Sequence, residues 1–510
     1  MPVIGIDLGT SNTCVAVVMD GQPQVILDDR SRSTMPSVMA LTRNGQFIVG
    51  HMARAQLAVS PETTIHSAKR FIGQKFEDPT VKAIIPSLSY DVCKMENGLV
   101  GFVVGDNVLT PVEVSAAVLK KVKAIAESAI GSEVTQAVIS VPAHFDNIQR
   151  TATKRAAEIA GLEVLRLINE PTAAALAYGY GGDEAKVIAI YDFGGGTFDI
   201  SVLEIGDGIY NVLATGGDTF LGGNDFNQAL AAHLFERFRQ RTGIDLSRYP
   251  VSRQRVLDAA EFAKIQLSTV EMTHVTLEDV VPESGKRVNM DEILTRSQLE
   301  QLCSQFVERS LDICDSVFAN AGIDARVLDE IVMVGGTSRM PLVRQMTERY
   351  FGKRPNTAIN PDEAVAIGAA IQAKALDDED SDVLLLDVVP LTLGIEAAGG
   401  VFIPLISKNT KVPHRVSRVF TTNRDNQDSV IISIYQGEAN LCRENTLLST
   451  FELTGIRPAP RMEPQIEVTL RIDVNGILSI TAVDLDTHQS QSVQVVDMSV
   501  RILNDLQKQP

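Results

Sequence analysis

Two short segments of this sequence place carboxylates beside glycine-rich turns, a combination suited to holding a phosphate and a cation. Residues 190–199, IYDFGGGTFD, put Asp192 before three consecutive glycines and Asp199 after them. Glycines let backbone N–H groups approach a phosphate closely, and flanking carboxylates can hold a hydrated divalent cation against it. The pattern therefore fits a nucleotide, although an ordinary hairpin with a glycine-rich tip would look the same.

The second segment, residues 4–13 (IGIDLGTSNT), repeats this order. An apolar strand leads to Asp7, a glycine and several hydroxyl residues, and another apolar strand follows. The two segments are separated by roughly one domain length. Their recurrence predicts two similar lobes that face each other across a cleft, and chance similarity is the alternative.

Other polar residues could complete such a site. Lys69 could reach a terminal phosphate, and Glu170, at the end of a predicted strand, could hold a metal-bound water. Glu261, Lys264 and Ser268 share one face of a predicted helix and could grip a ribose or a base edge. Each feature also has a plainer explanation, namely a solvated lysine, a helix cap and a solvated helix face.

Residues 331–341, IVMVGGTSRMP, predict a buried strand, two glycines and the start of a helix. Ser338 is the predicted N-cap, and Pro341 lies where the first turn of a helix tolerates proline. A helix N-terminus beside bare glycine backbone can bind an anion, and the Arg339 guanidinium could stack on a flat base.

The pattern of elements changes along the chain. Strands and helices alternate up to residue 376, an acidic connector occupies 377–387, and helical periodicity disappears from 388 to about 500. Alternating apolar residues and the turn Asn475-Gly476, a signal for a two-residue hairpin, predict an antiparallel β-sandwich of seven or eight strands. The apolar run inside the connector predicts either a buried strand or a segment that docks reversibly on a neighbouring lobe. Residues 501–510 are predicted to form a short tail, part of a possible short helix.

Composition excludes several classes of function. The 510 residues carry a net charge of −18, which repels nucleic acid and anionic membranes. The N-terminus has no signal-peptide pattern and the sequence has no long apolar run, so we expect a cytoplasmic protein. Five dispersed cysteines and seven dispersed histidines indicate neither a disulfide framework nor a zinc site.

Taken together, the motifs resemble those of a DnaK-type member of the seventy-kilodalton heat-shock chaperone family, and they occur in the family's order. The matching segments are 6–10, 169–172, 192–199, 335–341 and 382–390. The resemblance runs from residue 2 to about 500. It implies a two-lobed, actin-like α/β ATPase domain followed by an all-β sandwich. No helical lid follows in this sequence, which is either a lid-less member or a fragment, and for this chain we expect faster peptide release than in lidded relatives.

The resemblance also implies roles for individual residues around ATP or ADP. Those that would bind the phosphates are Thr10, Ser11, Asn12, Gly194, Gly195, Gly196 and Thr197. Those that would bind adenosine are Glu261, Lys264, Ser268, Gly335, Gly336, Arg339 and Asp362. Those that would hold hydrated Mg²⁺ are Asp7 and Asp192, whereas Asp199 would hold K⁺. The implied catalytic residues are Lys69, Glu170, Asp192, Thr197 and Asp199, in keeping with a reaction that demands placed charges more than covalent chemistry.

A second implied site binds extended apolar segments of unfolded proteins, under the control of ATP binding and hydrolysis. Residues that would couple the two sites are Pro142, Arg150, Arg166, Leu384, Leu385 and Asp387. Residues that would line or bridge the peptide groove are Ile395, Ala398, Phe420, Asn423, Val430, Ile432 and Ile466. A groove that pairs with a peptide backbone can accept many sequences. The implied partners are a J-domain co-chaperone, for which Arg166 and Asp387 match, and a nucleotide exchange factor.

Several residues depart from the family pattern. Asp146-Asn147 reverses the usual order, Phe220 replaces a usual histidine, and Asn224 replaces a usual acidic residue. These changes bear on J-domain stimulation and lobe rotation more than on ATP binding. Ala398 matches a position over the groove, opposite Asn423, that often carries a larger side chain in the family, so we expect a weaker bridge over bound peptide.

Two other functions fit part of the pattern. A sugar kinase or actin-like filament protein would account for both glycine segments but not for the connector and the sandwich. A nucleotide-dependent binding module, or an exchange-factor-like relative, would hold its partners without productive cycling. The complete set of Asp7, Lys69, Glu170 and Asp192 argues against that second alternative.

Overall fold

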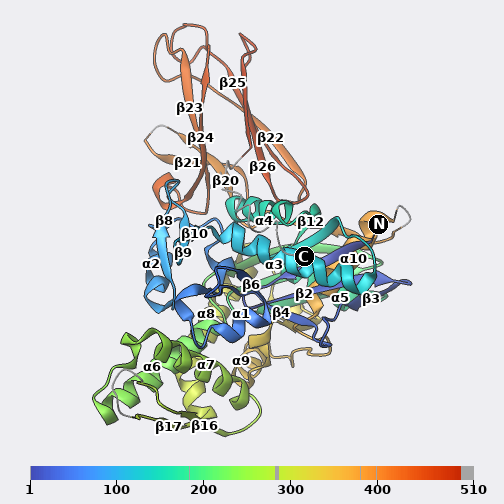
Figure 1. Ribbon diagram of the computed structural model, residues 1–510. Coiled ribbons are helices and arrows are strands. Elements are labelled where there is room, and N and C mark those ends of the chain that lie inside the picture. Colours follow the sequence, from blue (N-terminus) through green and yellow to red (C-terminus); the bar gives the residue numbers. More distant parts are fainter. Residues whose placement is uncertain (1, 183, 282–286, 379–380, 398, 495–510) are drawn as a thin grey trace.

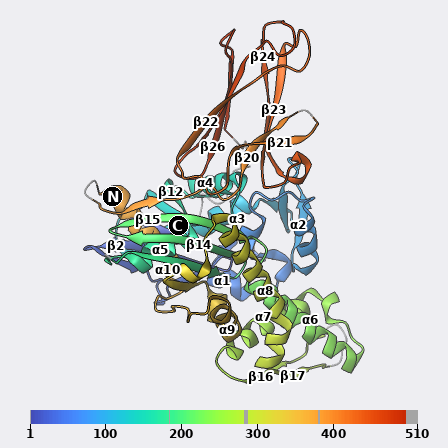
Figure 2. The same cartoon turned by 180° about the vertical axis from the view of Figure 1, so that it is seen from behind.

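The computed structural model describes residues 2–182, 184–281, 287–378, 381–397 and 399–494. A mixed α/β part is followed by an all-β part, which stands above helices α3 and α4 in Figure 1 and projects from the same end of the molecule in Figure 2. No helix within the described residues combines the length and the apolar character needed to cross a membrane.

The first large sheet has the strand order β12-β11-β1-β2-β3, with β4 also paired to β2. Strands β1, β2 and β3 form an antiparallel meander, and β11 and β12 add to β1 in parallel. The strands are β1 (Val3–Leu8), β2 (Asn12–Met19), β3 (Gln22–Val25), β4 (Thr34–Pro36), β11 (Gln136–Val141) and β12 (Glu163–Asn169). The hairpin β1–β2 carries the first glycine segment at its tip.

The second large sheet is built in the same way, with the order β18-β13-β14-β15-β19. An antiparallel meander of β13, β14 and β15 is extended in parallel by β18. The strands are β13 (Lys186–Phe193), β14 (Phe198–Gly206), β15 (Ile209–Asp218), β18 (Glu330–Val334) and β19 (Leu384–Leu386). The second glycine segment lies at the tip of β13–β14, so the two motifs occupy equivalent places in two similar sheets.

Helices α5 and α10 pack between these sheets. One buried cluster contains Val3 and Val138 of the first sheet, Ile190 of the second, and alanines of both helices. Gly368 makes this packing possible, because a Cβ there would lie 1.7 Å from the carbonyl oxygen of Ala173. Backbones approach this closely only where no side chain intervenes.

The remaining helices cover the outer faces of the sheets. Helices α3 and α4 pack on the first sheet, and α6, α7 and α8 form the core beside the second. The helices are α1 (His51–Gln56), α2 (Pro79–Ile84), α3 (Pro111–Ile130), α4 (Asn147–Ile159), α5 (Glu170–Gly179), α6 (Gly223–Thr242), α7 (Pro250–Leu267), α8 (Arg296–Ala321), α9 (Pro341–Phe351) and α10 (Ala364–Asp377).

Three small sheets complete the α/β part. Their strands are β5 (Met39–Leu41), β6 (Phe47–Val49), β7 (Thr64–Ile65), β8 (Asp91–Lys94), β9 (Val100–Val104), β10 (Asn107–Leu109), β16 (Met272–Leu277) and β17 (Met290–Thr295). Around β5, β7 and β9 lies a separate apolar cluster that includes Phe71, Tyr90 and Phe102, hereafter the Phe71 cluster.

The all-β part consists of two four-stranded antiparallel sheets, β21-β20-β23-β24 and β22-β25-β26-β27. Their strands are β20 (Leu393–Ala397), β21 (Val401–Ile406), β22 (His414–Phe420), β23 (Ser429–Gln436), β24 (Thr446–Thr454), β25 (Ile466–Ile472), β26 (Leu478–Asp484) and β27 (Ser490–Gln494). Inward-facing residues of both sheets form one core, as the alternating pattern predicts. The predicted short helix and tail after residue 497 lie outside the described residues.

Two local predictions need correction, and the alternative left open for the connector is resolved. Ser338 does not cap a helix: residues Gly336–Arg339 form a 3-10 turn, and α9 begins at Pro341 with Met340 as its N-cap. Asn475-Gly476 does not form a two-residue hairpin, because Ile472 pairs with Leu478 and five residues lie between them. The apolar run of the connector forms strand β19, which pairs in parallel with β15 and buries Leu385.

Candidate functional site

The two glycine-tipped hairpins meet tip to tip. A Cβ on Gly195 would lie 2.3 Å from Ser11 Oγ, and one on Gly196 would lie 2.4 Å from Thr10 Cγ2. Thr10 and Thr197 are themselves buried, and Asn12 begins strand β2 with an exposed side chain. The tips therefore tolerate no side chain beyond those present, and they offer backbone N–H groups in a confined space.

Four carboxylates and one lysine gather beneath these tips. Lys69 Nζ donates to Glu170 Oε1 in an ion pair whose partners are both more than nine-tenths buried. Ser140 Oγ donates to Asp7 Oδ1 at 2.9 Å. Burial and the charge of Glu170 raise the pKa of Asp7 to about 7, while Lys69 opposes this shift.

The other two carboxylates experience the same crowding. Burial, Glu170 and Asp7 raise the pKa of Asp192 well above its ordinary value. Burial, Glu170 and Asp192 do the same for Asp199, whose Oδ1 accepts a hydrogen bond from the backbone N–H of His144 at 3.1 Å. Because one lysine opposes several mutually repelling carboxylates, this site would gain stability from an added cation.

The donor set fits a hydrated cation better than a directly ligated one. In the described part of the chain, no three His, Cys, Asp or Glu side chains converge to hold a metal ion. Asp7 and Asp192 could still bind Mg²⁺ through water, because Mg²⁺ commonly keeps several of its water ligands in phosphate sites.

The residues expected to bind adenosine divide into two groups. Lys264 Nζ donates to the carbonyl oxygen of Gly223 at 3.1 Å, and Ser268, at the end of α7, donates to the carbonyl oxygen of Lys264. Arg339 Nη2 lies 2.5 Å from Asp362 Oδ2, and both side chains are nearly half exposed. The guanidinium is thus held at its edge, because Nη2 also donates to Asn360 Oδ1 at 2.9 Å.

Gly335 and Gly336 lie between the second hairpin and this Arg339 pair. Gly335 has a φ of +79°, and a Cβ there would lie 2.4 Å from the carbonyl oxygen of Phe193. The neighbouring Thr337 Oγ1 donates to the carbonyl oxygen of Gly194 at 2.8 Å. The turn after β18 is therefore fixed against the glycine tip of β13–β14.

A cavity of about 150 Å³ opens beside the tips. Its walls come from the first hairpin tip (Thr10, Ser11 and Asn12), from residues 66–71 and from helices α6 and α7. Glu261 on α7 belongs to this wall, where its carboxylate pairs with Arg54 Nη2 at 2.6 Å. Glu261 thus faces the cavity, but it is already engaged by a residue that the motifs did not indicate.

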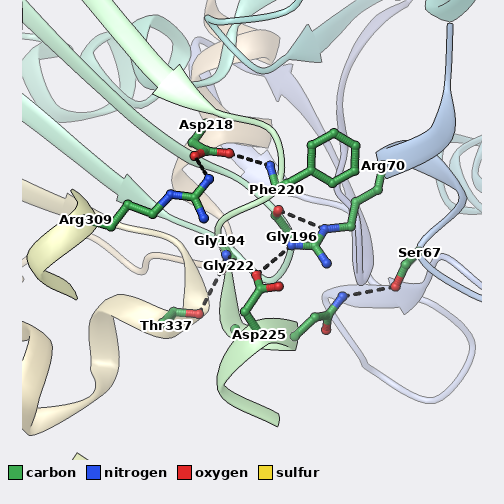
Figure 3. A network of polar contacts seen from close by, with 12 residues as sticks. Ser67, Arg70, Gly194, Gly196, Asp218, Phe220, Gly222, Asp225, Arg309 and Thr337 are labelled. Carbon is green, nitrogen blue, oxygen red and sulfur yellow. Dashed lines mark hydrogen bonds and ion pairs between the residues drawn. The ribbon is translucent and has the colours of Figure 1, made fainter. Parts of the chain in front are cut away.

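Sequence patterns also missed Arg70, Asp225 and Ser67, which link the two sides of the cavity (Figure 3). Arg70 Nη2 donates to Asp225 Oδ2 at 2.6 Å, and Asn224 Nδ2 donates to Ser67 Oγ at 3.0 Å. These pairs are separated by more than 150 residues in the chain, so no local spacing could reveal them.

The expected coupling residues lie where the connector and the sandwich contact the α/β part. Asn169 Nδ2 donates to both carboxylate oxygens of Asp387, at 2.9 and 3.0 Å, and Asn169 Oδ1 accepts from Arg150 Nη2 at 2.6 Å. Arg150 also donates to the carbonyl oxygen of Asn475 in the sandwich. Burial raises the pKa of Asp387, whereas Arg150, Arg166 and several hydrogen bonds oppose that shift.

The other coupling residues belong to the same region. Pro142 is buried directly after β11. Leu384 and Leu385 lie in β19, where Leu385 is buried and Leu384 is about half exposed. Lys411 Nζ from the sandwich donates to Asn211 Oδ1 at 2.5 Å and to the carbonyl oxygen of Val212 in β15.

The residues expected to bind peptide are largely in the sandwich core. Ile395, Ile432 and Ile466 are buried, and Phe420 and Val430 pack against them while partly exposed. Asn423 lies in the exposed loop after β22. Ala398 lies outside the described residues.

Comparison with protein families agrees with the resemblance seen in the motifs. A family model described as Hsp70 protein matches residues 3–509, which is nearly the whole chain. Hsp70 proteins are chaperones with ATPase activity, and they generally bind ATP or ADP with Mg²⁺. On this match, the chain belongs to the Hsp70 family.

Proposed function

We propose that this chain is an ATP-dependent chaperone whose α/β part hydrolyses ATP and whose β-sandwich binds extended apolar peptides. In this proposal residues 1–376 form a two-lobed nucleotide-binding domain, 377–387 the connector and 388–500 the peptide-binding domain. The observation that carries it is the buried Lys69–Glu170 pair, which lies with Asp7, Asp192 and Asp199 beneath the touching glycine tips.

The hydrolytic roles follow from charge and position. Backbone N–H groups of Gly195 and Gly196, with Thr10 and Thr197, would surround the phosphates, whereas the Gly194 N–H donates to the carbonyl oxygen of Thr197 within the tip. The Lys69 ammonium would lie against the terminal phosphate, and Glu170 would orient the attacking water and accept its proton. Asp7 and Asp192 would hold hydrated Mg²⁺, which would neutralise phosphate charge, and Asp199 would hold K⁺.

Coupling to the sandwich is supported by two adjacent residues, one of which contacts the catalytic lysine and the other the connector. Glu170 pairs with Lys69, and the preceding Asn169 binds Asp387 of the connector and Arg150. A shift of the β12–α5 junction on nucleotide binding would therefore disturb the contacts of the connector. The proposal includes a J-domain partner and an exchange factor acting on this coupled cycle.

Single-turnover hydrolysis of ATP tests the proposal. We expect hydrolysis by the wild type to accelerate when an extended apolar peptide is added. Lys69→Ala should lower the rate at least 100-fold while the protein still binds ADP, since the lysine contributes charge at the terminal phosphate. Lys82→Ala, at an exposed lysine paired with Glu77, is the matched control and should hydrolyse ATP normally.

Two results would contradict the proposal. Hydrolysis that ignores peptide would remove the coupling between the sites. An active Lys69→Ala variant would remove the catalytic assignment, because no other lysine lies in the described carboxylate group beneath the glycine tips.

A further inference from the structure

Arg70 lies next to the proposed catalytic Lys69 but takes part in a different set of contacts. It belongs to the 3-10 turn Ala68–Phe71 and is 5% exposed. Its guanidinium reaches Gly196 in the second glycine tip and Asp225 at the start of α6 (Figure 3). The residue therefore connects the wall of the cavity formed by residues 66–71 with the opposite wall, where α6 begins.

The guanidinium of Arg70 binds two structural elements of the opposite side. Its Nε donates to the carbonyl oxygen of Gly196 at 3.0 Å, in the glycine tip itself. Its Nη2 donates to Asp225 Oδ2, and the same oxygen accepts from the backbone N–H of Gly222 at 2.7 Å. Hence one side chain ties the tip of β13–β14 and the start of α6 to the turn that holds Lys69.

Phe220 adds an aromatic contact to these hydrogen bonds. Its ring lies 5.8 Å from Arg70 Cζ, within the range of a cation–π interaction, and it packs while half-buried against the Phe71 cluster. The loop beneath the ring is rigid, because Asp218 accepts from the Phe220 backbone N–H at 2.8 Å and pairs with Arg309. A side chain from the loop after β15 thus packs against an apolar cluster on the other side of the cavity.

We propose that this Arg70–Phe220 contact holds the cavity closed and limits the rate at which nucleotide leaves. The two sides cannot separate without withdrawing the Phe220 ring from the Phe71 cluster and exposing both to water. Separation also breaks the Arg70 hydrogen bonds, and it leaves the buried guanidinium without its partners. The role rests on the proposed nucleotide site, and Phe220 acts as a positioning residue rather than a catalytic one.

A neutral, apolar ring at position 220 suits this contact better than an imidazole would. An imidazole is polar and would gain less from burial in the Phe71 cluster, and in its charged form it would face the Arg70 guanidinium. A neutral ring has neither disadvantage. We therefore expect closure in this chain to depend on apolar packing rather than on a titrating group.

Dissociation of a fluorescent ADP, measured by stopped flow with excess unlabelled ADP as competitor, tests the contact. Phe220→Ala should accelerate dissociation roughly tenfold, which corresponds to about 1.4 kcal/mol at 25 °C. Phe220→Leu, which keeps the apolar packing, should restore the rate to within about threefold of the wild type. The rate of hydrolysis of bound ATP should change little, because Phe220 does not belong to the carboxylate group beneath the tips.

The matched control is Phe262→Ala, which makes the same change at a phenylalanine on α7 that is 61% exposed. Its dissociation rate should equal that of the wild type. If Phe220→Ala releases ADP at the wild-type rate, or if Phe262→Ala releases it equally fast, the proposal is wrong.

Amide hydrogen exchange without nucleotide separates this proposal from the nucleotide site on which it rests. Phe220→Ala should increase exchange in residues 66–72 and 218–225, whereas Phe262→Ala should leave both segments unchanged. A wild type that binds no ADP would refute the proposed function and, with it, the part of the inference that concerns release. Unchanged exchange in Phe220→Ala would refute closure by this contact even if ADP binds normally.

Discussion

Asp146, the N-cap of α4, offers a direct measurement of what a buried carboxylate costs this protein. Its side chain accepts from the Gln149 backbone N–H at 2.8 Å, and Gln149 Oε1 accepts in return from the Asp146 backbone N–H. Burial raises the pKa of Asp146 to about 6 despite these hydrogen bonds and the charge of Arg150. Replacement by asparagine preserves the cap and removes the charge, since both residues are favoured at N-caps.

The sign of the effect follows from linkage. The pKa of this carboxyl group is about 6 in the folded protein, compared with its ordinary value of 3.8 in the unfolded chain. The folded state therefore binds the proton more tightly. Stability is therefore lost as the pH rises from about 4 to 6, and the full cost is present above pH 6. Asp146→Asn should remove this cost, so it should stabilise the protein at pH 8 and have much less effect at pH 4.

The size of the effect can be bounded. A shift of about two pKa units corresponds to at most about 3 kcal/mol, and solvent screening at this partly buried side chain reduces it to about 1 kcal/mol. In a domain of this size we expect the melting temperature to rise by about 1–2 °C at pH 8. Differential scanning calorimetry at both pH values measures it. Asp78→Asn, at the N-cap of α2, controls for replacing a capping carboxylate by an amide.

Two outcomes would refute this reasoning. An equal change in melting temperature at pH 4 and pH 8 would mean that charge is not the cause. A destabilised variant at pH 8 would mean that attraction between the carboxylate and the N-terminal end of the α4 dipole exceeds the cost of burial.

Two further predictions concern packing and docking. Gly368→Ala should prevent folding or lower the melting temperature by more than 5 °C, because its Cβ would overlap the Ala173 carbonyl oxygen. Gly182→Ala is the control and should be tolerated, because the nearest atom to its Cβ would lie 3.5 Å away. Thermal melting of the two variants measures the difference. Lys411→Ala should weaken docking of the sandwich on β15 by removing the bonds to Asn211 and Val212. Faster cleavage of the acidic connector by a glutamate- and aspartate-specific protease would show this, and an unchanged rate would contradict it.

The sequence was most informative where function depends on short segments. The glycine tips and their aspartates could be located because the turn and its carboxylates are adjacent in the chain, and the structure brings both tips together. The repeated pattern also indicated two sheets of similar construction. The core of the sandwich followed from simple alternation, since strands with one buried face have a period of two.

Local patterns were least informative where the same residues are compatible with two different local structures. Ser338 has the chemistry of an N-cap, but its hydroxyl donates to the carbonyl oxygen of Gly335 and closes a 3-10 turn instead. Both outcomes satisfy the serine hydroxyl, and the sequence does not distinguish between them. The connector posed the same difficulty, because an apolar run can pair as a strand or dock transiently, and only the position of β15 decides.

Contacts between distant segments are the features that the sequence could not predict, and they include the contacts of Arg70 and Asn475. Arg70 meets Gly196 and Asp225 because the 3-10 turn and the second hairpin converge, and Asn475 accepts from the Leu167 backbone N–H at 2.8 Å because the sandwich docks on β12. In both cases one side chain forms a hydrogen bond with a backbone group far away in the chain, so neither residue spacing nor periodicity in the sequence indicates the contact. The glycine and carboxylate motifs therefore indicate the reaction that we propose, whereas contacts between distant segments hold the sandwich on the α/β part and, in our proposal, keep the cavity closed.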